Sequence, residues 1–328
     1  MSWRPWSRRV VLAVGLGGAL AASLTSGAWA DNDAGAWTSV ADVPAPTEGM
    51  STANVGDLIV AAYGFSPFGG DTNLTRIYDI AGNSWSVGSP APTPASSEGI
   101  AVSHDDSIYA LGGRNGAGND NNRYEPSSDT WTVLAPMPTA RDGLGAAVVG
   151  DSIYAIGGRP QTFGPCTGFT TLANNEKYDI ASNTWTTAAP LSTPRSDVGV
   201  IAHGGKVYVL GGCTGVGPAT ITNEVDIYNP ITNTWTTGAP MPTARAAFYG
   251  IGIKGDTIYV IGGEDKTGAP SPANEAYDIA HDSWSTSSPM PHPRGEMGVV
   301  SHGGRIFTVG GGVPGFGSSQ STNDVFKP

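Results

Sequence analysis

Tryptophan recurs along this chain at a nearly constant interval. Successive tryptophans are 48, 46, 54, 50 and 49 residues apart, and a tyrosine stands seven residues before each of the last five. Asn or Asp lies two residues before those five tryptophans and tolerates the left-handed backbone of a tight turn. The six tryptophans at this interval are Trp37, Trp85, Trp131, Trp185, Trp235 and Trp284. A period of this length predicts an array of repeated units, each a hairpin or more.

A second repeated feature is a short apolar run that ends in Gly-Gly. SIYALGG, SIYAIGG, KVYVLGG, TIYVIGG and RIFTVGG end at residues 113, 158, 212, 263 and 311. The first copy, LIVAAYG, keeps Gly64 and has Tyr63 in place of the other glycine. Such β-branched runs are typical of strands buried on both faces. We therefore expect four strands per unit, a to d, with Gly-Gly after b, Tyr in c and Trp in d.

Gly-Gly, Tyr and Trp at these spacings resemble the Kelch motif, and the resemblance extends from Asp31 to Pro328. It implies an all-β, six-bladed Kelch-type β-propeller with four-stranded blades. The last unit stops after its third strand, and Trp37 belongs to a fourth strand with nothing before it. We therefore predict that residues 36–40 complete the sixth blade beside residues 323–328, which closes the ring and protects two sheet edges.

The first thirty residues have the features of an export signal. A basic head, MSWRPWSRR, precedes the apolar run VVLAVGLGGALAASL and an Ala28-Trp29-Ala30 cleavage site. Sec export and twin-arginine export, suggested by Arg8-Arg9, both remain open. We expect a bacterial protein with residues 1–30 as signal peptide and a secreted or periplasmic propeller at 31–328, monomeric and without a membrane span.

The charge of the expected mature chain restricts its partners. The signal contains three of the 17 basic residues and no acidic ones, so 14 basic residues face 28 acidic ones, a net charge of −14. Such a surface repels phosphate backbones, so nucleic acid is not an expected partner.

Few side chains suggest a metal or a cofactor, and we expect neither. Cys166 and Cys213 are the only cysteines, and we predict a disulfide between them, across neighbouring loops of the ring. His104, His203 and His302 fall in one kind of turn, a-b, of three units and are expected to lie too far apart to share an ion. His281 and His292 are attributed to turn and loop chemistry.

Variation in length points to one face of the ring. The b-c loops differ most in length, and they share a face with the d-a loops. On that face we predict ligand-binding arginines in the d-a loops, with Glu48 and Glu98 in the equivalent places of the first two units and two further arginines after Gly-Gly. The predicted ligand-binding residues are Arg141, Arg195, Arg245, Arg294, Arg114 and Arg159. The alternative is that these arginines are structural and bond loop carbonyls or nearby acids.

Three functions fit such a frame, and the fold alone does not select among them. The first is a binding module that presents b-c and d-a loops to a protein, a glycan or an anionic ligand. The second resembles the periplasmic N-acetylneuraminate epimerase, a six-bladed Kelch protein, and would use Arg245 or Arg294 with Glu264 as acid/base. The third is a copper radical oxidase, which the histidine positions disfavour. The sequence therefore favours a binding protein over an enzyme.

Overall fold

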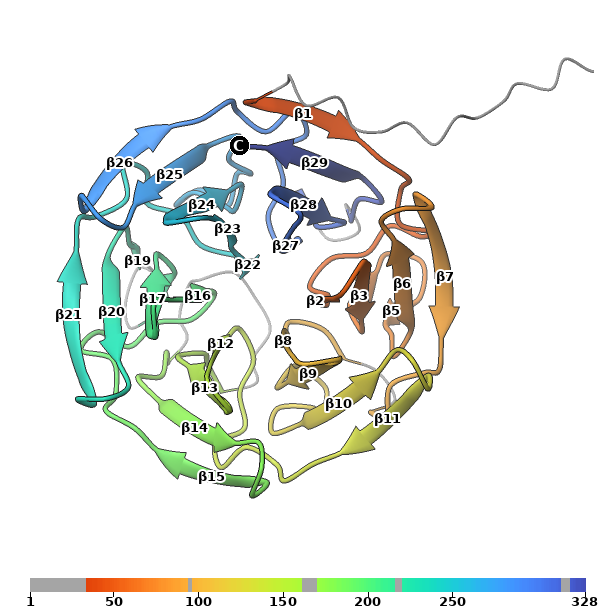
Figure 1. Cartoon of the computed structure of the whole chain (residues 1–328), viewed down its shortest axis with the longest axis horizontal. Helices are drawn as coiled ribbons and strands as arrows, with labels where there is room; N and C mark the ends of the chain where they lie inside the picture. Colours follow the sequence, from red (N-terminus) through yellow and green to blue (C-terminus); the bar gives the residue numbers. More distant parts are fainter. Residues whose placement is uncertain (1–33, 94–95, 161–169, 216–219, 314–318) are drawn as a thin grey trace, which may run out of the picture. The chain divides into compact units, whose positions relative to one another are not determined.

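The computed structural model describes residues 34–93, 96–160, 170–215, 220–313 and 319–328, and the predicted signal peptide lies outside these ranges. Every regular element in them is a β-strand. Six four-stranded antiparallel sheets follow one another around a ring, as Figure 1 shows. The prediction of a six-bladed propeller is confirmed.

Each blade runs outward from strand a to strand d. The a strands are β2 (Ser51–Val55), β8 (Ile100–His104), β12 (Gly145–Val149), β16 (Gly199–His203), β23 (Gly252–Lys254) and β27 (Gly298–His302). The b strands are β3 (Leu58–Ala62), β9 (Ser107–Leu111), β13 (Ser152–Ile156), β17 (Lys206–Leu210), β24 (Thr257–Ile261) and β28 (Arg305–Val309). The c strands are β6 (Thr75–Asp79), β10 (Asn121–Glu125), β14 (Asn175–Asp179), β20 (Val225–Asn229), β25 (Asn274–Asp278) and β29 (Asn323–Lys327). The d strands are β7 (Ser84–Gly88), β11 (Thr130–Val133), β15 (Thr184–Thr187), β21 (Thr234–Gly238), β26 (Ser283–Thr286) and β1 (Ala36–Ser39).

The ring closes as the sequence predicts. β1 pairs antiparallel with β29, so that Trp37 lies opposite Phe326 with ring centroids 5.0 Å apart. The first described strand of the chain thus forms the outer edge of the blade made by its last three strands (Figure 1). This pairing removes two sheet edges that would otherwise be exposed.

The repeated Trp and Asn/Asp residues also connect neighbouring blades by hydrogen bonds. Trp235 Nε1 donates to the carbonyl of Ala189, 2.8 Å away in the preceding blade. The backbone N–H of the same Ala189 donates to Asn233 Oδ1 at 2.8 Å, and this oxygen also accepts a hydrogen bond from Tyr228. Trp85, Trp131, Trp185 and Trp284 repeat the first contact. Each Trp therefore stabilises a blade junction through its ring and through its N–H.

The core consists of junctions between neighbouring blades. Between the first two blades, Ala53 and Val60 pack with Ala101, Ile108 and Tyr124, all of them buried. Each junction thus combines the inner strands of one blade with the Tyr of the next. This packing buries the inner strands, from which the a-b and d-a loops extend.

Two short hairpins and one bridging strand lie outside the blades. β4 (Phe65–Ser66) pairs with β5 (Gly70–Asp71) in the first b-c loop, and β18 (Cys213–Thr214) pairs with β19 (Thr220–Ile221) in the fourth. β22 (Tyr249–Gly250) pairs in parallel with β27. β22 occurs in blade five, where the segment from the d-a arginine to the first glycine of Gly-Gly is one residue longer than in blades three, four and six.

Candidate functional site at the channel mouth

The four d-a arginines are in the blade interiors. Arg141, Arg195 and Arg245 are 0% exposed and Arg294 is 1% exposed. Each guanidinium binds a carboxylate at the second residue of the c strand in its own blade. The pairs are Arg141–Glu176, Arg195–Asp226, Arg245–Glu275 and Arg294–Asp324.

These arginines also bond backbone carbonyls of their own blades. Arg245 Nη1 donates to Gly262 O at 2.5 Å, and Arg294 Nε donates to Gly310 O at 2.6 Å. Burial lowers the pKa of Arg245, and the nearby Glu275 opposes that shift. The arrangement is that of the structural alternative, with one difference. The acids that bind these arginines come from the c strands and not from the d-a loops.

The expected equivalence of Glu48 and Glu98 with the arginines is wrong. The carbonyl of each d-a arginine accepts a hydrogen bond from the second glycine of the preceding blade, as in Gly158 N→Arg195 O at 2.8 Å. In the first two blades the same contact is made to Thr47 and Ser96. Glu48 therefore lies one residue beyond the arginine position, and Glu98 lies two residues beyond it.

Glu98 belongs to a ring of residues around the channel mouth that all have left-handed backbone. Their φ angles lie between 50° and 62°, and the six residues are Gly49, Glu98, Gly143, Asp197, Ala247 and Glu296. Five backbone hydrogen bonds of 2.6–3.0 Å link successive members, and Phe248 N→Asp197 O at 3.5 Å completes the circle. Glycine adopts this backbone readily, whereas other residues are strained in it. Three of the four strained residues are acids.

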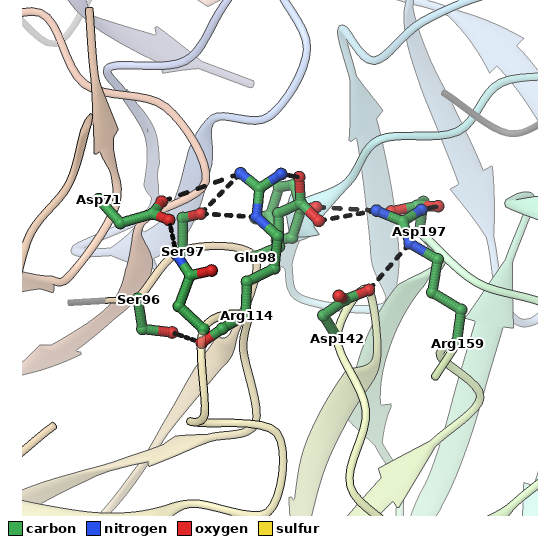
Figure 2. A network of polar contacts seen from close by, with 10 residues as sticks. Asp71, Ser96, Ser97, Glu98, Arg114, Asp142, Arg159 and Asp197 are labelled. Atoms are coloured by element: carbon green, nitrogen blue, oxygen red, sulfur yellow. Dashed lines mark hydrogen bonds and ion pairs between the residues drawn. The ribbon is translucent and has the colours of Figure 1, made fainter. Parts of the chain in front are cut away.

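Glu98 and Asp197 belong to an ion-pair network centred on Arg159 (Figure 2). Arg159 binds Glu98 at 2.7 Å, Asp142 at 2.8 Å and Asp197 at 2.5 Å. Burial opposes ionisation of Arg159, but Asp197 and Glu98 outweigh it and its pKa is raised. Burial also raises the pKa of Asp142, to about 7, against the pull of Arg159.

Glu98 extends the network to the second arginine that follows Gly-Gly. Arg114 Nη1 lies 2.9 Å from Glu98 Oε1, and its Nε and Nη2 donate to Ser97 Oγ (Figure 2). Asp71 of β5 lies 3.9 Å from the same guanidinium. The two predicted arginines are therefore at the mouth, and both guanidiniums are paired with carboxylates there.

The other half of the mouth contains three glutamates, contributed by blades five, six and one. Glu48, Glu264 and Glu296 are partly buried, and none has an ion pair within 4 Å in the part of the chain that the structure describes. Burial raises the pKa of Glu264 to about 7, and Asp197 and Glu48 add to the shift. Burial, together with Glu98 and Glu48, raises the pKa of Glu296 well above its usual range. The mouth is therefore acidic, and the predicted ligand-binding arginines are paired with carboxylates instead of presenting positive charge there.

A hairpin beside this acidic half carries an exposed aromatic ring. Phe68 lies between β4 and β5 and is 86% exposed. The base of the hairpin is held in the mouth, because Phe65 pairs with Glu48 and Asp71 contacts Arg114. Leu74, in the same b-c loop, is 42% exposed.

The remaining candidates lie elsewhere. Cys213 follows Gly212 and is buried, whereas Cys166 falls outside the described residues, so the pairing of the two stays a prediction. His104, His203 and His302 lie in a-b turns and contact Asp151, Asp256 and Asp57 of the next blade. His281 pairs with Asp278 in its own turn, and His292 contacts Asp324.

Some kinds of site find no support in the described ranges. They contain no group of three or more His, Cys, Asp or Glu side chains placed to hold a metal ion. No helix in them is long and apolar enough to span a bilayer. A hollow of about 240 Å³ along the axis is lined by the a strands, with Val102, Val148 and Ile201 among its mostly apolar side chains. It offers few polar groups to orient a ligand.

Reasoning from sequence missed Glu296 and Phe68 as mouth residues, and it placed Glu48 on the right face but one residue out of register. The sequence did contain a signal for the arginine position in the first two blades. In blades three, four and six the arginine lies 16 residues before the first glycine of the pair. The same count in the first two blades gives Thr47 and Ser96 and leaves the glutamates free to face the mouth.

Four-stranded blades with Gly-Gly, Tyr and Trp in fixed places define a Kelch-type propeller, and comparisons with known proteins agree. The Kelch motif model matches residues 101–138, 194–242 and 245–291. The chain belongs to the Kelch-repeat proteins.

Individual relatives share part of the chain or the fold. "Kelch-like protein terF" of Aspergillus terreus is 29% identical over 299 residues, which are 86% of this chain and 65% of that protein. "Alpha-scruin" of Limulus polyphemus is 28% identical over 139 residues, 40% of this chain and 14% of that protein. This chain thus spans less than two thirds of both. The solved structure of YjhT has a TM-score of 0.72 at 15% identity, covering 87% of this chain and 95% of that one, and shows a shared fold.

Proposed function

We propose that this propeller is an interaction module whose b-c/d-a face binds a protein partner. The partner would supply an apolar pocket for Phe68 and basic side chains for the mouth glutamates. One observation carries the proposal: Phe68, 86% exposed on an anchored hairpin, stands beside three glutamates that have no ion pair among the described residues. Exposed aromatic side chains are among the residues that contribute most to binding energy at protein interfaces. The match to the Kelch motif supports a binding role.

The charge of the mouth favours a basic partner. Burial raises the pKa of Glu48, Glu264 and Glu296, and repulsion by neighbouring acids adds to the shift of each. A lysine or arginine placed among them would relieve that repulsion and would be steered there by the net charge of residues 31–328. An anionic ligand, one of the ligands that the sequence analysis left open, would be repelled by these glutamates.

Site-specific photo-crosslinking in the native host tests the face. A photoreactive residue replaces Phe68 in one variant and Ile231 in another. Ile231 is a matched control, because it is also apolar, is 93% exposed and lies in a c-d turn of the opposite face. One defined product from position 68, absent from position 231, is expected. Equal products from both positions, or none from 68, would contradict the proposal.

An isomerase acting on a sugar is a second candidate, because one group in the mouth has suitable acid-base properties. The pKa of Glu264, raised to about 7 by burial, suits a general acid or base near neutral pH. Arg245 and Arg294, the expected sugar-carboxylate ligands, are instead bound to Glu275 and Asp324. NMR exchange between anomers of N-acetylneuraminate tests it. Exchange faster than the spontaneous rate in wild type, lost in Glu264→Gln, would support an isomerase. Exchange at the spontaneous rate in both proteins would exclude this activity.

We also propose that the chain is exported, with residues 1–30 removed and a Cys166–Cys213 disulfide formed. The basic head, apolar run and A-x-A site support cleavage near Ala30. Amino-terminal sequencing of the mature protein should begin near Asp31. Alkylation of the unreduced protein should label neither cysteine, and labelling of both would disprove the disulfide.

A further inference from the structure

Blade one contains a buried arginine that pairs with no carboxylate in the described ranges of the chain. Arg76 is the second residue of β6 and is 3% exposed. Its Nη1 donates to the carbonyl of Tyr63 at 3.1 Å. Among the described residues, no carboxylate lies within 4 Å of its guanidinium.

The other blades show what normally occupies this place. In blades three to six the same c-strand position holds Glu or Asp, and the d-a loop supplies the arginine that binds it. The guanidiniums of Arg195, Arg245 and Arg294 donate to the carbonyl of the first glycine of the pair. Tyr63 holds that glycine's position in blade one, so Arg76 makes the same contact from the opposite strand.

Blade two lacks both members of this ion pair. Ser96 stands at the arginine position and Asn122 at the acid position. Tyr63 extends from blade one into this gap, and Asn122 Nδ2 donates to its hydroxyl at 3.1 Å. Blade two thus has neither member of the ion pair, although Asn122 Nδ2 also donates to the carboxyl of Asp120 at 3.1 Å. Blade one has Thr47 where blades three to six have arginine, and it retains the cation alone.

An isolated buried cation is unfavourable. Removing one partner of a buried ion pair leaves the other desolvated without compensation, and proteins seldom tolerate this without another counter-charge. Burial lowers the pKa of Arg76 to about 10, with no acid opposing the shift as Glu176 does for Arg141. At neutral pH the guanidinium is still charged.

We propose that Arg76 binds a small monovalent anion, a halide or a free carboxylate such as formate, in the place that a c-strand or loop carboxylate would otherwise fill. The anion accepts hydrogen bonds from the guanidinium nitrogens that do not bind Tyr63 O. It acts as a structural counter-ion of blade one and is independent of the partner-binding role proposed above.

Anion-dependent thermal stability tests the site. Sodium chloride or sodium formate replaces sodium methanesulfonate at constant ionic strength, and unfolding is followed by tyrosine and tryptophan fluorescence. Wild type should show a saturable rise in Tm that Arg76→Gln lacks. Arg123→Gln is the matched control, because it removes an arginine from the next c strand that is paired with Glu125 and 34% exposed. That variant should respond as wild type does.

Bromide provides a readout that does not depend on stability. Anomalous diffraction from crystals soaked in sodium bromide should show a peak at the Arg76 guanidinium in wild type. A saturable response of equal size in wild type and Arg76→Gln would overturn the proposal. Bromide peaks at surface arginines with none at Arg76 would also overturn it.

Discussion

Glu296 offers a direct test of whether the mouth acids are present for stability or for binding. It has left-handed backbone with φ 50°, and its carboxyl is partly buried near Glu98, Glu48 and Glu264. Ala247 holds the equivalent place in blade five with φ 60° and no charge. Gly49 and Gly143 show that glycine fits the same ring. We predict that Glu296→Gly stabilises the protein.

The magnitude follows from two contributions. Left-handed backbone costs an L-residue about 1–2 kcal/mol, and glycine returns about 0.5–1 kcal/mol of that as entropy of the unfolded chain. Ala247→Gly should therefore raise the free energy of unfolding by roughly 0.5–1 kcal/mol. Glu296→Gly should exceed this increment, because it also removes a carboxyl whose ionisation burial and neighbouring acids oppose.

The excess has a defined pH dependence. Because the folded-state pKa of Glu296 is raised above 4.5, the folded protein binds more protons than the unfolded chain. The contribution of Glu296 to stability is therefore intact below about pH 4.5 and falls as pH rises towards the folded-state pKa. Urea unfolding of the three proteins from pH 4 to 8 should show the advantage of Glu296→Gly over Ala247→Gly widening with pH. Equal gains at every pH would refute the reasoning.

Three further predictions concern the frame and the mouth. Glu176→Gln leaves Arg141 buried without its carboxylate and should lower the free energy of unfolding by about 3–5 kcal/mol. The control Glu125→Gln, at a more exposed ion pair, should lower it by at most about 1 kcal/mol. Equal losses would contradict a structural role for the d-a arginines. Trp37→Ala removes the ring that packs on Phe326 in the blade that closes the propeller, and it should lower the free energy of unfolding in urea by about 3 kcal/mol. A decrease below about 0.5 kcal/mol, as at an ordinary surface site, would argue against closure by β1. Glu264→Gln should flatten the fall in stability between about pH 4.5 and 7 that its raised pKa implies, and an unchanged pH profile would show that this carboxyl titrates normally.

Most of the frame could be predicted because each repeated residue has a local task. The Trp spacing, Gly-Gly and the turn Asn or Asp recur in each blade because the contact that Trp235 and Asn233 make with Ala189 must be made at each junction. The unpaired strand at either end of the array then required β1 to join β29.

The mouth was harder to predict, because its chemistry depends on one-residue offsets. Glu48 and Glu98 look equivalent in sequence, since each precedes a glycine. The left-handed residue, however, is Gly49 in the first blade and Glu98 in the second, so one glutamate contacts Arg159 and the other has no ion pair among the described residues. A repeated arginine such as Arg245 also resembles a ligand-binding residue until the c-strand acid that binds it is located.

The most direct test of the account is the affinity of the crosslinked partner, measured by calorimetry against three proteins. Phe68→Ala should weaken binding at least tenfold, about 1.4 kcal/mol, and Ile231→Ala should bind as wild type does. Binding to wild type should also weaken with salt, since the mouth glutamates would be screened. An affinity for Phe68→Ala within twofold of wild type would contradict the claim that this face is the binding surface.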